Sequence, residues 1–390
     1  MKNIIKLVFV IFASISFVSA NAGTLNVTGT AKATYNISSS DSSAAANESG
    51  KGLGVVNEIT FGAAGELENG WTWSYNMALD PAGADTTAGG AATNDDTGLA
   101  LTTPYGSIAA NISQGSLNKQ LTFSTAAYKA GVDLGYGAII DPAGLGDYNN
   151  LQYHSPAGLI PFGTVFKVGF SPSADVEGSA SDNNQGAIAN AAANPAMSAS
   201  SALPYDTLTS SAAPSAVSSI VEYSVETKPI DGLTISASYV DIDSSIAKAT
   251  DHSQYEAGAV TVKYAYGPVT VGYGRNAITP HVAASNADAY FVNLVDNRDI
   301  SIGYAVNENL TVSYEQSSSE VNIKRRTVAN VVTKKTLKQD VDTIQAAYTM
   351  GGMTLALSQA NIDGDGYTGN EVGTSRKDVK ETIFAVTMAF

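Results

Sequence analysis

Residues 57–80 read NEITFGAAGELENGWTWSYNMALD, and this stretch decides the fold. Apolar and polar residues alternate on both sides of a short turn, which is the pattern of a strand with one apolar face. The apolar face carries Ile59, Phe61, Ala63 and Leu67 before the turn, then Trp71, Trp73, Tyr75, Met77 and Leu79 after it. Between them, Asn69-Gly70 suits the positive φ angles of a tight hairpin. The stretch therefore predicts two antiparallel strands.

The same alternation recurs along the chain and predicts sixteen strands in all. Their expected ranges are 24–35, 57–67, 71–79, 98–103, 106–113, 150–155, 162–171, 219–227, 233–241, 255–266, 269–275, 298–306, 310–316, 341–350, 353–360 and 380–390. Membrane-crossing strands need only about 9–11 residues and alternate apolar with polar side chains. The polar faces are rich in Thr, Ser, Asn, Gly, Glu and Lys, which favour water over a packed core.

The connections between these strands alternate between short and long. Seven short turns fall at 68–70, 103–106, 156–161, 228–232, 267–268, 307–309 and 351–352, and eight long loops at 36–54, 81–97, 114–149, 172–218, 242–254, 276–297, 317–340 and 361–379. A sheet in lipid must close on itself, because an open edge would leave backbone groups without partners. The pattern predicts an all-β fold, a transmembrane antiparallel up-and-down β-barrel with short periplasmic turns and long external loops.

Composition agrees with a barrel and excludes several other classes. Of the 390 residues, 15% are charged, against roughly 25% in soluble globular proteins. Cysteine is absent, so disulfide scaffolds, zinc ribbons and cysteine nucleophiles are excluded. The 36 acidic residues exceed the 21 basic ones, which argues against nucleic acid as a partner. The 19 tyrosines suit the aromatic girdles where a barrel wall meets the lipid headgroups.

The first 22 residues resemble a secretory signal peptide. Lys2 and Lys6 precede an apolar run from Leu7 to Val18, which is too short to span about 30 Å of hydrocarbon as a helix. Small residues follow, and cleavage is expected after Ala20 or Ala22. We expect residues 1–22 to be removed and 23–390 to form one outer-membrane barrel domain.

The last strand places Phe384, Val386, Met388 and Phe390 on one face and ends on an aromatic residue. This resembles the C-terminal signature of Gram-negative outer-membrane barrels. The layout of the whole mature chain is similar to that of the general diffusion porins. The resemblance implies a trimer of sixteen-stranded barrels in the outer membrane, a terminal Phe390 that the barrel assembly machinery recognises, and a third loop folded into the pore.

That third loop is the range 114–149. Its apolar residues suggest packing against a wall, and Asp133, Asp141 and Asp147 could then present carboxylates to a constriction, together with Lys119 and Lys129. The alternative is an external loop with a small hydrophobic cluster. The acidic Pro-Glu-Phe-Gly-Gly-Asp motif of the enteric porins is absent from this chain.

Strand parity predicts which charges face the lumen. They are Lys32, Lys167, Lys263, Glu58, Glu222, Glu315 and Glu381. We interpret them as solvated pore-wall charges rather than ligands of a specific molecule. Opposed charges in a pore set its ion selectivity. Because acidic residues outnumber basic ones, we expect a mild preference for cations.

Two predicted loops contain motifs that could bind a ligand or could simply be solvated. Residues 361–366 resemble the start of a Ca²⁺ loop, but the first Asp is missing and Val372 stands where the final Glu belongs. Asp363 and Asp365 could hold a loosely bound Ca²⁺, or the segment is a solvated loop tip. A basic run in the predicted loop 317–340 could contact lipopolysaccharide phosphates or simply be solvated. It comprises Lys324, Arg325, Arg326, Lys334, Lys335 and Lys338.

No catalytic pattern is present. His154, His252 and His281 are far apart, and the sequence lacks G-x-S-x-G and H-E-x-x-H. We therefore expect no enzymatic activity and no cofactor. The leading hypothesis is passive diffusion of ions and small hydrophilic solutes through a water-filled channel in the lipid bilayer. A substrate-selective porin for one nutrient is the first alternative, and a surface adhesion or S-layer-like β protein is the second.

Overall fold

The structure is a computed structural model, and it describes most of the chain in thirteen separate stretches. These are residues 23–41, 50–80, 93–112, 114–117, 127, 145, 149–171, 198–199, 217–244, 255–279, 290–326, 332–367 and 377–390. The predicted signal peptide lies outside these described residues. Within them, no helix has the length and apolar character needed to cross a membrane.

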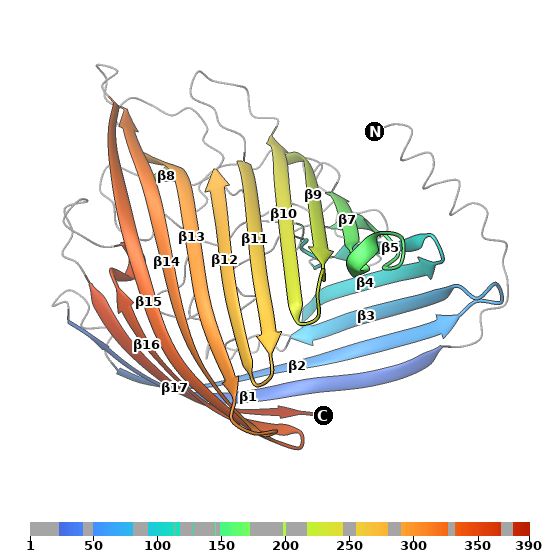
Figure 1. Cartoon of the computed structure of the whole chain (residues 1–390), viewed down its shortest axis with the longest axis horizontal. Coiled ribbons are helices and arrows are strands. Elements are labelled where there is room, and N and C mark those ends of the chain that lie inside the picture. The colour runs from blue at the N-terminus through green and yellow to red at the C-terminus, as the bar shows by residue number, and fades with distance from the viewer. Residues whose placement is uncertain are drawn as a thin grey trace.

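Sixteen antiparallel strands make up the wall of the molecule, and each pairs with its neighbour in the chain (Figure 1). They are β1 (Thr24–Ser40), β2 (Gly50–Glu66), β3 (Thr72–Asp80), β4 (Thr93–Thr103), β5 (Gly106–Ile112), β6 (Asn150–His154), β7 (Val165–Ser171), β9 (Val217–Thr227), β10 (Leu233–Ser244), β11 (Tyr255–Tyr266), β12 (Val269–Thr279), β13 (Tyr290–Ala305), β14 (Leu310–Arg326), β15 (Val332–Met350), β16 (Met353–Asp363) and β17 (Asp378–Ala389). A two-residue strand, β8 (Ser198–Ala199), pairs with the start of β13 and stands outside this series.

The first and last strands close the sheet into a barrel. β1 pairs with β17 over eleven register positions, from Thr30↔Ala389 to Ser40↔Val379. Beyond them, Gly29 and Phe390 exchange two backbone hydrogen bonds of 2.8 and 3.0 Å. The closed sixteen-stranded barrel predicted from the alternation is therefore confirmed.

Each strand presents one face to the outside and one to the lumen. On the outward face, large apolar side chains remain exposed, as Tyr273 of β12, Ile300 of β13 and Leu355 of β16 illustrate. On the inward face, alternate residues such as Ser301, Glu315 and Thr343 are buried. This is the division expected of a wall between lipid and a polar interior.

Several strands continue well past their predicted ends. β14 runs to Arg326 and β15 begins at Val332, so most of the predicted loop 317–340 is a paired hairpin. Period-two alternation continues there with its polarity reversed. Val321 and Ile323 are buried inside the barrel, whereas Lys338 and Thr336 are exposed on the outside. Beyond the lipid the outward face is in contact with water and its residues are polar. A prediction that requires apolar outward residues therefore places the end of the strand too early.

The basic run is accordingly placed on strands and not in a loop, which corrects the sequence prediction. Lys324, Arg325 and Arg326 end β14, and Lys334, Lys335 and Lys338 lie on β15. Lys324 and Lys334 are direct cross-strand partners.

One predicted strand begins later than expected. Pro161–Gly163 form a 3₁₀ turn, η5, in which Phe162 has a φ of 62°, and β7 starts only at Val165.

Candidate functional site: the lumen and the segment 114–149

The described residues of the segment 114–149 lie against the inner face of the barrel. Glu222, an inward residue of β9, is fully buried. Its two carboxylate oxygens accept backbone N–H hydrogen bonds from Leu117, at 2.6 Å, and from Leu145, at 2.7 Å. Hydrogen bonds to an ionised acceptor are about twice as strong as neutral ones. Glu222 therefore fixes two points of the segment, 28 positions apart, to one place on the wall.

Amide side chains of β3 and β6 hold the beginning and end of the same segment. The Asn150 side-chain amide donates to the carbonyl oxygens of Gln114, at 2.8 Å, and Leu145, at 2.9 Å. The Gln152 amide donates to the carbonyl of Gly115. Asn76 donates to the Gln114 side-chain oxygen at 3.3 Å. Because backbone groups in irregular segments need partners when buried, these amides replace the partners that a regular element would supply.

Apolar contacts reinforce the polar ones. Leu145 is completely buried in a cluster with inward residues of the outer half of the barrel, among them Ile220, Val240 and Tyr255. At the middle of the segment, the N–H of Ala127 donates to Ser313 Oγ at 2.7 Å. Ala127 also packs against a small-residue patch of Ala347, Ala356 and Ala385 on β15, β16 and β17. The described points of the segment thus contact opposite parts of the inner wall.

A second inward-folded turn follows β16. It is η6 (Asp365–Tyr367), where the left-handed conformations of Gly366 and Tyr367 (φ of 63° and 57°) bend the chain back. Tyr367 is buried, and its hydroxyl lies 2.8 Å from Ser319 Oγ of β14. The Gly366 N–H donates to Gln339 Oε1 of β15 at 2.9 Å. This turn covers the inner face of β14 and β15.

The predicted pore-wall charges separate into two groups. Glu222, Glu315 and Glu381 face inward but are buried rather than solvated. The segment 114–149 covers Glu222, and Glu381 accepts a 2.6 Å hydrogen bond from Asn36 Nδ2. By contrast, Glu58 and Lys263 are exposed, and Lys32 and Lys167 are half-buried. The five candidate constriction residues, Asp133, Asp141, Asp147, Lys119 and Lys129, lie outside the described residues.

The exposed part of the inner wall is on the first strands. Val56 faces inward opposite Lys32 and is 59% exposed. Glu58 next to it, and Ser74 on β3, are exposed as well. Val341 on β15 faces inward too, but it is completely buried. The lumen is therefore open along β2 and the periplasmic half of β3, whereas the outer half of the inner wall is filled against β9–β17 and at Ala78 of β3.

The two aspartates of the Ca²⁺-like motif point to different surroundings. Asp363 is exposed on the outer face of β16, whereas Asp365 is buried and forms a 2.5 Å ion pair with Lys377 Nζ. Among the residues that the structure describes, no group of three or more His, Cys, Asp or Glu side chains is arranged to hold a metal ion.

The residues that anchor the inward segments were not among the residues predicted to be functional. Asn76, Asn150, Gln152 and Tyr367 fix the inward segments, yet none stands out in the alternation. A weak signal was available for two of them, since Asn150 and Gln152 place large amides on the inward parity of a strand that directly follows the long segment.

The geometry defines a membrane barrel whose inner wall binds the described residues of the segment 114–149, and comparison with known proteins agrees with the barrel fold. The family model described as Gram-negative porin matches residues 8–295. The chain therefore belongs to the Gram-negative porin family and is an outer-membrane channel protein. No curated protein sequence matches it.

Solved structures share the fold at low sequence identity. OmpF of Salmonella typhi, in complex with daunomycin, aligns with a TM-score of 0.61 at 14% identity, covering 95% of this chain and 98% of OmpF. An anion-selective porin from Comamonas acidovorans aligns at 0.57 and 12% identity, covering 94% and 100%. The trimer form of OmpT from Vibrio cholerae aligns at 0.56 and 10% identity, covering 95% and 100%.

Proposed function

We propose that this protein is a water-filled channel for passive diffusion of ions and small hydrophilic solutes, narrowed by the segment 114–149. The observation that carries the proposal is the double anchor at Glu222, which binds the N–H groups of both Leu117 and Leu145 from inside the wall. A segment tied inward at both ends and at Ala127 reduces the cross-section of the lumen. Family and fold favour a channel over an enzyme.

The water path runs along the inner face of β1–β3. Exposure of Val56 and Glu58, against the burial of Val341 and Glu315, supports this position. Solutes therefore pass Lys32 and Glu58, and these two residues are the wall charges that act on them most directly.

A mild cation preference follows from the excess of acidic residues and from the exposed Glu58. The same fold occurs in a porin described as anion-selective, so the preference depends on side chains and not on the barrel. A reversal potential measured in a salt gradient tests the sign, and a chloride-favouring potential contradicts the proposal.

Three further properties are proposed from the family. The functional unit is a homotrimer, Phe390 is the recognition signal for the barrel assembly machinery, and residues 1–22 are a cleaved signal peptide. The Ca²⁺ site at Asp363 and Asp365 survives only as a weak alternative, because Lys377 already neutralises Asp365.

Reconstitution into a planar bilayer tests the central proposal. We expect stepwise conductance in groups of three, and absence of conductance from correctly folded protein overturns the channel function. The alternative of a substrate-selective porin predicts that one class of nutrient blocks the current at low concentration. A passive channel predicts no such block.

A further inference from the structure

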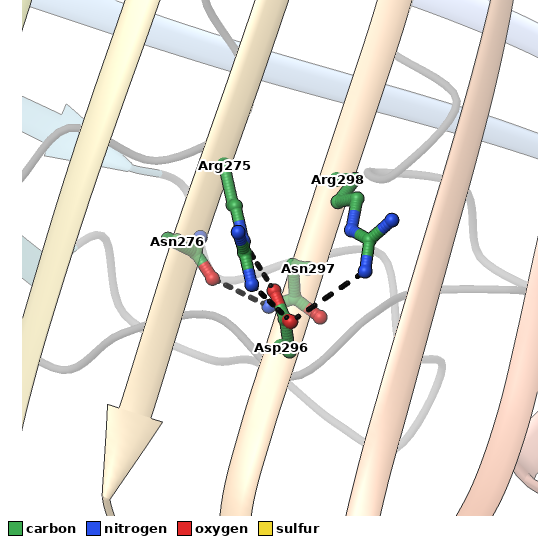
Figure 2. A network of polar contacts seen from close by, with 5 residues as sticks. All are labelled: Arg275, Asn276, Asp296, Asn297 and Arg298. Atoms are coloured by element: carbon green, nitrogen blue, oxygen red, sulfur yellow. Dashed lines mark hydrogen bonds and ion pairs between the residues drawn. The ribbon is translucent and has the colours of Figure 1, made fainter.

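Two arginines face each other on the outer wall. Arg275 of β12 and Arg298 of β13 are direct cross-strand partners on the outward face. Asp296, two register positions closer to the outer rim, accepts hydrogen bonds from Arg275 Nε at 2.9 Å and Nη2 at 2.7 Å. Arg298 Nη2 lies 3.8 Å from the same carboxylate (Figure 2). Like charges directly opposite each other destabilise a sheet, and one aspartate offsets only part of this repulsion.

In this cluster the two arginine side chains are exposed, whereas the aspartate is largely buried. The side chains of Arg275 and Arg298 are 52% and 55% exposed, while Asp296 is only 14% exposed. The three residues together carry one net positive charge. On the adjoining strand β11, Val260 is the direct partner of Arg275, and Gly258 is the partner of Ala277. A Cβ on Gly258 would have no atom nearer than 3.7 Å, so the outer face is open beside Ala277.

The height of the cluster matches the edge of the lipid. The next outward pair toward the periplasm is Tyr273↔Ile300, followed by Val271↔Ile302, and all four side chains are exposed and apolar. The arginines are thus the first charges beyond the apolar band, about 7 Å along the strand from its last pair. Anionic lipid headgroups attract basic side chains at this level.

Outward positions at the same level on the neighbouring strands do not carry a net positive charge. Continuing along the row from Arg298, the cross-strand partners are Ser318, Asp340, Asp363 and Asp378. The three aspartates repel an anion, so the positive part of the row is confined to β12 and β13. The basic pair Lys324 and Lys334 lies elsewhere, ten residues beyond Tyr314 on β14 and about 33 Å along the strand.

We propose that Arg275 and Arg298 form a binding site for a phosphate group of an anionic glycolipid of the outer leaflet, with the acyl chains lying over Tyr273 and Ile300. Guanidinium groups bind phosphate through two parallel hydrogen bonds. Asp296 positions Arg275 for this contact by holding its Nε edge. The inference rests on the outer-membrane location of the family and is independent of conduction.

The test uses the full mature chain in detergent micelles, with bis-phosphorylated lipid A as the probe and native mass spectrometry as the readout. The double variant Arg275→Gln/Arg298→Gln is expected to bind lipid A at least about tenfold more weakly. A matched control, Lys324→Gln/Lys334→Gln, removes the same charge from the hairpin tip and is expected to bind as the wild type does. Arg298→Gln alone keeps the Arg275–Asp296 pair and is expected to be intermediate.

Two further arms identify the ligand chemistry. Fully dephosphorylated lipid A is expected to bind weakly to every variant, and millimolar inorganic phosphate is expected not to displace lipid A. Equal binding of lipid A to the wild type and the arginine double variant overturns the proposal, as does a loss confined to the lysine variant. The heat-dependent gel shift of a folded barrel and unchanged conductance show that the arginine variant is intact. A wild type without conductance refutes the channel function only.

Discussion

Leu145 occupies the space that a β-carbon on Gly169 would need. An ideal Cβ built on Gly169 of β7 would lie 2.1 Å from Leu145 Cδ1, far inside van der Waals contact. The wall lacks a side chain at this inward position, and the segment 114–149 fills the gap with a leucine. Segment and wall are therefore complementary in shape at one of the points where Glu222 also holds the segment.

Replacing Gly169 by alanine tests this complementarity. We expect Gly169→Ala to displace Leu145, to lower the free energy of unfolding by about 1–3 kcal/mol, and to change the single-channel conductance. Gly258→Ala is the matched control, because the nearest atom to its new Cβ is 3.7 Å away. Identical conductance of Gly169→Ala and the wild type would show that the segment does not set the pore size.

Removing the charge of Glu222 tests the anchor. Glu222→Gln keeps one acceptor oxygen, so one of the two N–H bonds is lost or weakened, at a cost of about 1.5–3 kcal/mol. We expect larger and noisier single-channel currents as the segment moves away from the wall. Glu226→Gln is the control on the same strand, since Glu226 is more exposed and pairs with Lys228 at 3.6 Å. Noise that increases equally in both variants would contradict the anchoring role.

The absence of cysteine from the chain allows the water path to be mapped with single cysteines. We expect a charged thiol reagent to modify Val56→Cys quickly and to reduce its conductance, because Val56 is exposed to the lumen. Val341→Cys, inward but buried, should react slowly, and Val55→Cys, on the outward face of β2, should not affect the current. Fast modification of Val341→Cys would place the water path along β15 instead.

Tyr367 is expected to hold the turn after β16 inside the barrel. Tyr367→Ala removes a buried ring and the hydroxyl contact with Ser319, so we expect a conductance increase and a loss of about 3–5 kcal/mol of local stability. Tyr367→Phe loses only the hydroxyl and should conduct almost as the wild type does. Single-channel recordings and native-state proteolysis near residue 367 check both. An unchanged current in Tyr367→Ala would mean that the turn lies clear of the path.

The exposed wall charge Glu58 is expected to affect the ion selectivity of the channel. Glu58→Gln is expected to shift the reversal potential in a salt gradient toward the value for chloride, because this carboxylate is solvated. Glu381→Gln, buried beside Asn36, is expected to shift it less. The opposite ranking of the two variants would argue against a path along β1–β3.

The strands were predictable because lipid imposes a strong pattern. All sixteen alternating stretches are strands, since every outward position in the membrane must be apolar and every backbone group must be paired. The extensions of β14 and β15 could not be predicted from apolar outward residues. Beyond the lipid the apolar residues, such as Val321 and Ile323, lie on the inward face instead. The alternation of residues therefore predicts which side chains face the lumen and which face outward, but it does not predict where a strand ends.

The lumen was less predictable than the wall. Parity placed Glu222, Glu315 and Glu381 on the inward face, but it could not show that they are buried there. Their burial depends on contacts distant in sequence, such as Leu117 with Glu222 across 105 positions. No local pattern encodes such a contact, and the same holds for Tyr367 with Ser319.

The joint between Gly29 and Phe390 constrains when the barrel can form. It unites the first strand of the wall with a residue 361 positions later, and a β-carbon on Gly29 would lie 2.6 Å from the Phe390 ring. During synthesis, β1 is made long before its partner strand β17. The edge of β1 must therefore be kept from pairing with other chains until β17 has been made, because only then can the barrel close.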